Sequence, residues 1–288
     1  MSYPYYTDIV IRSQEDVEKY IDIKLARHIF IAKGVEANLP NLLHASQDVQ
    51  IEGHIVAEKL RSIHGELFFK NSAQAPYLPS LVYIGKSLII DNIIPEKSMP
   101  NLQDVYGMLF ILKNAKVEGF SRLSEIRSHI KIYGYLGHLN AITSRSFHSN
   151  LIVHGQLGSM KNLVSIYGNF IVNGKVLFMP ELRKVAGGDM IVNGEIKDLS
   201  LLHTVEGAFV VNGTIHKAPS LKTIGGEFVL NGKFNSPISS KLTTRENYEI
   251  DFKYINEDVR PAKQKTEEKP AYYDDACPPV VEAELERV

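Results

Sequence analysis

The stretch MKNLVSIYGNFIVNGKVLF, residues 160–178, is followed by three segments that repeat its pattern. They are MPELRKVAGGDMIVNGEIKD (179–198), LSLLHTVEGAFVVNGTIHK (199–217) and APSLKTIGGEFVLNGKFNS (218–236). Each segment contains a leucine, then an Ile or Val, a glycine, an apolar triplet and an Asn-Gly pair. Self-similarity at a fixed period indicates a repeat architecture, in which each unit buries its apolar face against its neighbours.

The Asn of each pair serves as a marker, and the apolar triplet before it continues toward the N-terminus after Asn-Gly is lost. Thirteen markers follow one another at intervals of about 20 residues: Arg12, Ala32, Glu52, Lys70, Asp91, Lys113, Tyr133, His154, Asn173, Asn193, Asn212, Asn231 and Asp251. Such a period has room for a strand, two corners and a short return, but hardly for a helix. We therefore predict a mainly β fold, a single-chain parallel β-solenoid of about 13 short coils.

The two ends of the chain depart from the repeat. Residues 13–28 place Val17 and Ile21 at helical spacing behind a capping-box pair, Ser13 and Asp16, which predicts a short N-terminal capping helix. We expect the solenoid domain to span 1–257. Residues 258–288 are charged, contain proline and lack periodicity, so they are predicted to form a disordered tail. Val280, Val281 and Leu285 in this tail form a candidate docking motif, and an ordinary solvated tail is the alternative.

The repeat L-x-x-I-x-G-x-F-x-V-N resembles a leucine-rich repeat, and especially the short repeats of receptor L-domain-like solenoids. The resemblance covers residues 8–252 and is clearest from 160 to 235. The chain lacks the cysteine modules that accompany extracellular receptor L domains, since its one cysteine is Cys277. The resemblance implies a binding scaffold and names no ligand.

The marker column differs between the two halves of the chain. In the C-terminal half, Asn173, Asn193, Asn212 and Asn231 are expected to stack as an amide ladder, with the Asn-Gly corners in a left-handed backbone conformation. In the N-terminal half, Glu52, Lys70, Asp91 and Lys113 are expected to form a ladder of alternating charge. An acid/base site built from Glu52 and Asp91 is the alternative for this half.

The middle residue of each triplet should face outward, because alternate residues of a strand point to opposite faces. These middle positions are mostly apolar, and we predict that nine of them form the main interaction face: Phe30, Phe68, Ile89, Ile111, Ile152, Ile171, Ile191, Val210 and Val229. Three explanations compete: strand propensity alone, a cover supplied by the 13–28 helix or the tail, and an interface with a protein partner or a second copy.

Composition excludes several classes of function. The 288 residues carry 32 basic and 33 acidic side chains, which argues against nucleic-acid binding. Neither a secretory signal nor an apolar run long enough for a membrane span occurs, so we expect a cytoplasmic protein without membrane insertion. The ten histidines lack metal-site spacing, and no complete phosphate-loop or nucleophile motif is present, so no metal, cofactor or catalytic residues are expected.

The interpretation that these observations favour is a non-enzymatic protein-binding or scaffold solenoid. Two alternatives belong to other classes. One is a filament-forming or virion structural protein, such as a bactofilin-like polymer, whose ends stack head to tail. The other is a carbohydrate-active parallel β-helix enzyme, which would need acids clustered on one face.

Overall fold

The computed structural model describes residues 6–71, 74–143, 147–235 and 243–244 of the chain. The chain divides into a unit of residues 1–250 and a second unit of residues 251–288. The predicted tail, with Val280, Val281 and Leu285, and the thirteenth marker, Asp251, lie outside the described residues.

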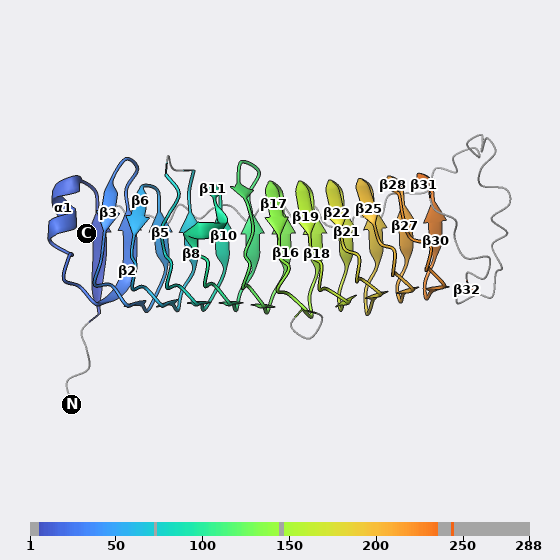
Figure 1. Ribbon diagram of the computed structural model, residues 1–288, viewed down its shortest axis with the longest axis horizontal. Coiled ribbons are helices and arrows are strands. Elements are labelled where there is room, and N and C mark those ends of the chain that lie inside the picture. Colours follow the sequence, from blue (N-terminus) through green and yellow to red (C-terminus); the bar gives the residue numbers. More distant parts are fainter. Residues whose placement is uncertain (1–5, 72–73, 144–146, 236–242, 245–288) are drawn as a thin grey trace, which may run out of the picture. The chain divides into compact units, whose positions relative to one another are not determined.

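The described residues form a parallel β-solenoid, as the repeat predicted, but with about 11 turns instead of the expected 13 coils. A strand lies at each of the first twelve apolar triplets, displaced by one residue at the triplet before Lys113, and successive triplet strands pair in parallel, side by side along the stack (Figure 1). The triplet strands are β1 (Thr7–Ile11), β2 (Leu25–Ile31), β5 (Val49–Ile51), β8 (Leu67–Phe69), β10 (Leu88–Ile90), β13 (Leu109–Ile111), β16 (Ile130–Ile132), β18 (Leu151–Val153), β21 (Phe170–Val172), β24 (Met190–Val192), β27 (Phe209–Val211) and β30 (Phe228–Leu230).

Two further rows of strands complete the turns. Short strands precede the triplets, and some of them join the triplet strands in one 17-stranded sheet. They are β4 (His44–Ala45), β7 (Ser62–Ile63), β9 (Tyr83–Ile84), β12 (Asp104–Val105), β15 (Glu125–Ile126), β20 (Ser165–Ile166), β23 (Lys184–Val185), β26 (Thr204–Val205), β29 (Thr223–Ile224) and β32 (Thr243–Thr244). The post-corner strands follow the marker: β3 (Glu36–Asn38), β6 (His54–Val56), β11 (Ile93–Ile94), β14 (Lys116–Val117), β17 (Tyr135–His138), β19 (Gln156–Ser159), β22 (Lys175–Phe178), β25 (Glu195–Asp198), β28 (Thr214–Ile215) and β31 (Lys233–Phe234).

The core runs along the inside of the stack, where all three rows contribute apolar side chains. One turn shows the pattern. Leu182, Val185, Met190, Val192 and Ile196 are each fully buried. Burying a side chain of this size stabilises the fold by about 1.5–3 kcal/mol. The repeat therefore persists because every turn supplies the same apolar positions to one continuous core.

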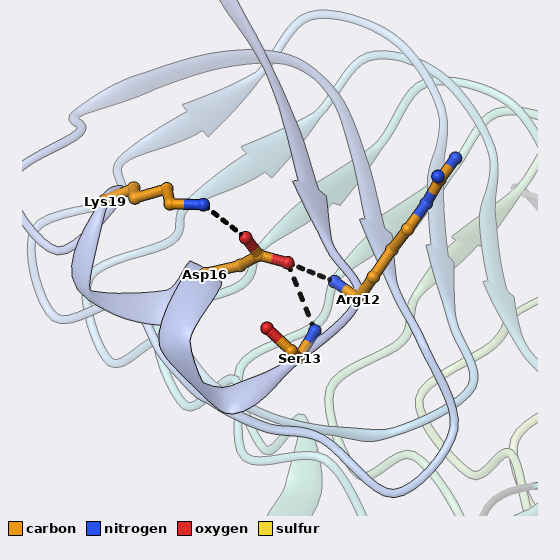
Figure 2. A network of polar contacts seen from close by, with 4 residues as sticks. All are labelled: Arg12, Ser13, Asp16 and Lys19. Carbon is orange, nitrogen blue, oxygen red and sulfur yellow. Dashed lines mark hydrogen bonds and ion pairs between the residues drawn. The ribbon is translucent and has the colours of Figure 1, made fainter.

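The N-terminal helix is much shorter than predicted. Helix α1 spans only Gln14–Glu18, and the chain enters strand β2 at Leu25. The capping pair itself is confirmed in part, since the Asp16 carboxylate accepts the backbone N–H groups of Arg12 and Ser13 at 3.0 and 3.2 Å and pairs with Lys19 (Figure 2). Pairing of residues 25–31 with β1 overrides the helical spacing, because it satisfies backbone groups along a whole strand.

Helix α1 covers the end of the stack. It contacts β1 and β3, and its Val17 is buried. Ile9 and Ile11 are consequently fully buried although β1 is the first strand of its sheet. The helix therefore protects the N-terminal edge of the core, as an end cap should.

The glycines of the Asn-Gly corners do not adopt a left-handed backbone, contrary to the expectation. Within the described residues, glycines with positive φ are Gly34, Gly119 and Gly187, none of which belongs to an Asn-Gly pair. The requirement for glycine comes from stacking instead. A Cβ added to Gly194 would lie 1.9 Å from the carbonyl oxygen of Gly174, and one on Gly174 would lie 1.9 Å from that of Gly155. Only a residue without a side chain fits this column.

Candidate protein-interaction face

The outward face of the triplet strands is the candidate site. In the triplet strands from β5 to β27 the first and third residues are buried and the middle residue is half-buried. The structure places eight of the nine predicted face residues at such a middle position or its equivalent in β2 and β30: Phe30, Phe68, Ile89, Ile152, Ile171, Ile191, Val210 and Val229. The alternation of a strand therefore arranges them in one column.

The prediction for Ile111 is wrong. Ile111 is the third residue of its strand, pairs with Ile90 and Ile132, and is fully buried. Phe110 occupies the outward position instead, opposite Ile89 and Lys131. The corner after this strand runs over four residues, 112–115. The marker position belongs to Leu112, directly after the strand, so the triplet read from Lys113 is displaced by one residue. A shift of one residue exchanges the two faces of a strand.

Two polar residues interrupt this apolar column. Gln50 lies between Phe30 and Phe68, and Lys131 lies between Phe110 and Ile152. The longest uninterrupted run therefore comprises the five middle residues of β18 to β30: Ile152, Ile171, Ile191, Val210 and Val229. We call this run the apolar stripe. Stacked neighbours cover Ile152, Ile171, Ile191 and Val210 on both sides along the sheet and Val229 on the side of Val210, which leaves the outer part of each side chain open to solvent.

The amide ladder beside the apolar stripe is confirmed. Each asparagine Nδ2 donates to the Oδ1 of the preceding rung: Asn193 to Asn173 at 2.7 Å, Asn212 to Asn193 at 2.8 Å, and Asn231 to Asn212 at 2.9 Å. The column continues past the asparagines, because Asn173 Nδ2 lies 3.1 Å from His154 Nδ1. The His154 ring stacks on Tyr133 with a centroid separation of 4.3 Å.

The charge ladder of the N-terminal half forms only at its first pair. Lys70 Nζ lies 2.7 Å from Glu52 Oε1, and Gln50 donates to the same oxygen at 2.9 Å. Burial raises the pKa of Glu52, but these hydrogen bonds outweigh it, so the pKa lies below its ordinary value. Asp91 Oδ1 is buried and has no hydrogen-bond partner among the described residues, and Lys113 lies one position beyond the column.

A second column of hydrogen bonds precedes the triplets and was not anticipated. The Oδ1 atoms of Asn150, Asn169 and Asp189 accept backbone N–H groups of the following turn at 2.8, 2.9 and 2.8 Å. The column ends at Ala208, whose backbone N–H donates to Asp189. The signal in the sequence is an Asn or Asp directly before the triplet, a residue type that bonds neighbouring backbone groups readily.

The described residues contain no group of three or more metal-ligating side chains. His44 Nδ1 contacts Ser62 Oγ at 2.8 Å, and His129 Nδ1 contacts Ser149 Oγ at 2.7 Å. Burial lowers the pKa of both histidines. Among the helices of the part described, none has the length and apolar character needed to cross a membrane.

Comparison with known proteins adds no identification. No family model matches the chain, and neither the curated proteins nor the solved structures include a significant match. The strand pairing is the evidence for the parallel β-solenoid. No family or homologue identifies the repeat as leucine-rich.

Proposed function

We propose that this chain is a non-enzymatic scaffold solenoid of the leucine-rich-repeat-like kind that binds protein through the outward face of its triplet strands. The observation that carries the proposal is the apolar stripe, five aliphatic side chains in register on five successive strands. The N-terminal helix was one candidate cover for this face. Helix α1 contacts β1 and β3, which lie at the other end of the stack from the apolar stripe. Contiguous apolar surface of this kind is typical of an interaction site.

The partner that fits the apolar stripe best is a second copy of the chain. Its side chains repeat at the strand spacing of about 4.8 Å, and a second copy presents the same repeat. Two such sheets can interdigitate along their whole length at the usual separation of about 10 Å. A surface without this period would match only a few of the five positions.

The direct test is the double variant Ile171→Lys and Ile191→Lys, measured by size exclusion with light scattering. The unmodified chain should have twice its single-chain mass of 32.3 kDa, and the variant should have the single-chain mass. Phe178→Lys with Thr214→Lys is the matched control, because it adds two lysines to the outward side of the post-corner strands. That control should remain a dimer.

Three outcomes would overturn the proposal of a second copy. They are a single-chain mass for the unmodified protein, an unchanged dimer in the Ile171→Lys, Ile191→Lys variant, and a broad series of larger masses, which a filament would give. Circular dichroism of each variant checks that the fold is intact. A chain ending at residue 257 shows whether the tail motif with Val280, Val281 and Leu285 contributes a separate contact.

A further inference from the structure

The Asn-Gly pairs can react with themselves, and the hydrogen bonds of the ladder limit this reaction. In an Asn-Gly sequence the glycine nitrogen can attack the asparagine Cγ, because no Cβ shields it. The new N–Cγ bond closes a succinimide ring, and the side-chain nitrogen leaves as ammonia with the proton of the attacking amide. Water then opens the ring at either carbonyl to give aspartate or isoaspartate, and one negative charge is added.

Each attacking nitrogen is held equally in the four pairs. The N–H groups of Gly174, Gly194, Gly213 and Gly232 all donate to a carbonyl of the preceding turn at 2.9 Å. A succinimide forms only when this N–H is released and the side chain rotates toward it. The backbone bond therefore slows the reaction at every pair, and a difference between pairs must come from the side chain.

The side-chain amide is held on both sides in the first three rungs and on one side in the last. Asn193 Nδ2 donates to Asn173, and Asn193 Oδ1 accepts from Asn212. Asn231 Nδ2 donates to Asn212, but within the described part of the chain Asn231 Oδ1 accepts no hydrogen bond. Rotation of the Asn231 side chain therefore breaks one hydrogen bond of the ladder. Rotation of Asn193 or Asn212 breaks two.

The strand before Asn231 is also less enclosed. The Leu230 and Val229 side chains of β30 are half-buried, whereas Val211, the counterpart of Leu230 in β27, is fully buried. A less enclosed strand opens locally at lower cost. Local opening is what frees the Gly232 N–H for attack.

We propose that Asn231-Gly232 is a site of spontaneous deamidation in the folded protein, and that stacking protects the three earlier pairs. Conversion of Asn231 replaces the Nδ2 donor with a carboxylate oxygen facing Asn212 Oδ1. The last rung is then lost. An isoaspartate also adds a backbone atom beside Gly232, where a Cβ would already lie 2.0 Å from the Gly213 carbonyl oxygen.

The chain contains its own matched control. Val172-Asn173-Gly174-Lys175 and Leu230-Asn231-Gly232-Lys233 have nearly the same flanking residues, so their unfolded reactivities should agree. The full-length protein is incubated in mildly alkaline buffer, and peptide mapping by mass spectrometry follows the conversion of each asparagine. The loss of one hydrogen bond worth about 1 kcal/mol predicts that Asn231 reacts about fivefold faster than Asn173 in the folded protein.

The same incubation in urea should make the two rates similar, because no ladder exists there. The variant Asn231→Ala moves the end of the ladder to Asn212, whose rate should rise about fivefold by the same argument. Equal rates for Asn173 and Asn231 in the folded protein would overturn the proposal. A persistent difference in urea would overturn it too, since local sequence would then be the cause, and so would an unchanged Asn212 rate in the variant.

Discussion

In the turns from Leu151 to Leu230, an asparagine follows almost every triplet. In the turns before Val117 the corresponding residue varies: it is Glu52, Lys70, Asp91 or Leu112. The regular half forms a continuous column of side-chain hydrogen bonds, and the irregular half forms one ion pair and leaves Asp91 Oδ1 without a partner in the part described. The reason is chemical. An amide both donates and accepts, so identical residues can stack without limit, but charges must alternate.

The largest contrast between the halves concerns glycine. Gly194→Ala should lower the free energy of unfolding by more than about 3 kcal/mol, because the added Cβ would lie against the Gly174 backbone and the turn must shift. Gly34→Ala, in the irregular half, should cost only about 1 kcal/mol, because the position has φ of +80° but open space around it. Urea unfolding of both variants measures the difference. Equal costs would show that the glycine column is not tightly stacked.

The second contrast compares the two kinds of column. Asn193→Ala removes two ladder hydrogen bonds and should lower the free energy of unfolding by about 1–2 kcal/mol. Lys70→Ala removes one partly exposed ion pair and should cost less than about 1 kcal/mol. Urea unfolding again supplies the measurement. A larger loss for Lys70→Ala would mean that the irregular half depends on its ion pair more than the regular half depends on amides.

Acid should loosen the first turns through Asp8. A hydrogen bond from Arg27 lowers the pKa of Asp8 to about 2, below its ordinary value of 3.8. The stabilisation is therefore present above the ordinary value and is lost as the pH falls through about 2. Hydrogen exchange of β1 and β2 should increase over this range in the unmodified protein and change less in Asp8→Asn. The same acid response in both proteins would contradict the assignment to Asp8.

The smallest effect is expected at His154, where the amide column begins. Burial, and then the charge of Lys131, lowers the pKa of His154. The neutral imidazole accepts from Asn173, so its contribution is present above the ordinary value of 6.5 and is lost as the pH falls through the lowered value. The NMR signals of the Asn173 side-chain amide should move with this titration. In His154→Asn the ladder gains a neutral rung, and signals that still titrated would rule out His154 as the cause.

Much of this fold was predictable from the sequence because the period, the triplet and the Asn-Gly pair recur together. The strand order and the buried first and third residues follow from stacking identical units. The errors arose where one local pattern competed with another. Residues 25–28 belong to the segment with helical spacing but form part of strand β2, which pairs with β1. After Ile111, a corner of four residues displaces the marker Lys113 from the register of the other turns.

The residues of the candidate site were largely predictable from the sequence. The neighbouring hydrogen-bond column was not. Alternation along a strand predicts which side chains face outward, and the apolar stripe follows from it. The corner column of Asn150, Asn169 and Asp189 escaped notice because each of these side chains bonds a backbone group of the next turn. The donor in each bond is a backbone N–H, which every residue except proline carries, so only the accepting Asn or Asp before the triplet is visible in the sequence.

The amide ladder also has an electrical direction. Every Nδ2 points toward the earlier turn and every Oδ1 toward the later one, so the side-chain dipoles of Asn173, Asn193, Asn212 and Asn231 add rather than cancel. The column therefore ends in partial positive charge beside His154 and in partial negative charge at Asn231. A lone pair is favoured at the first end, where the imidazole provides one, and a cation is favoured at the other.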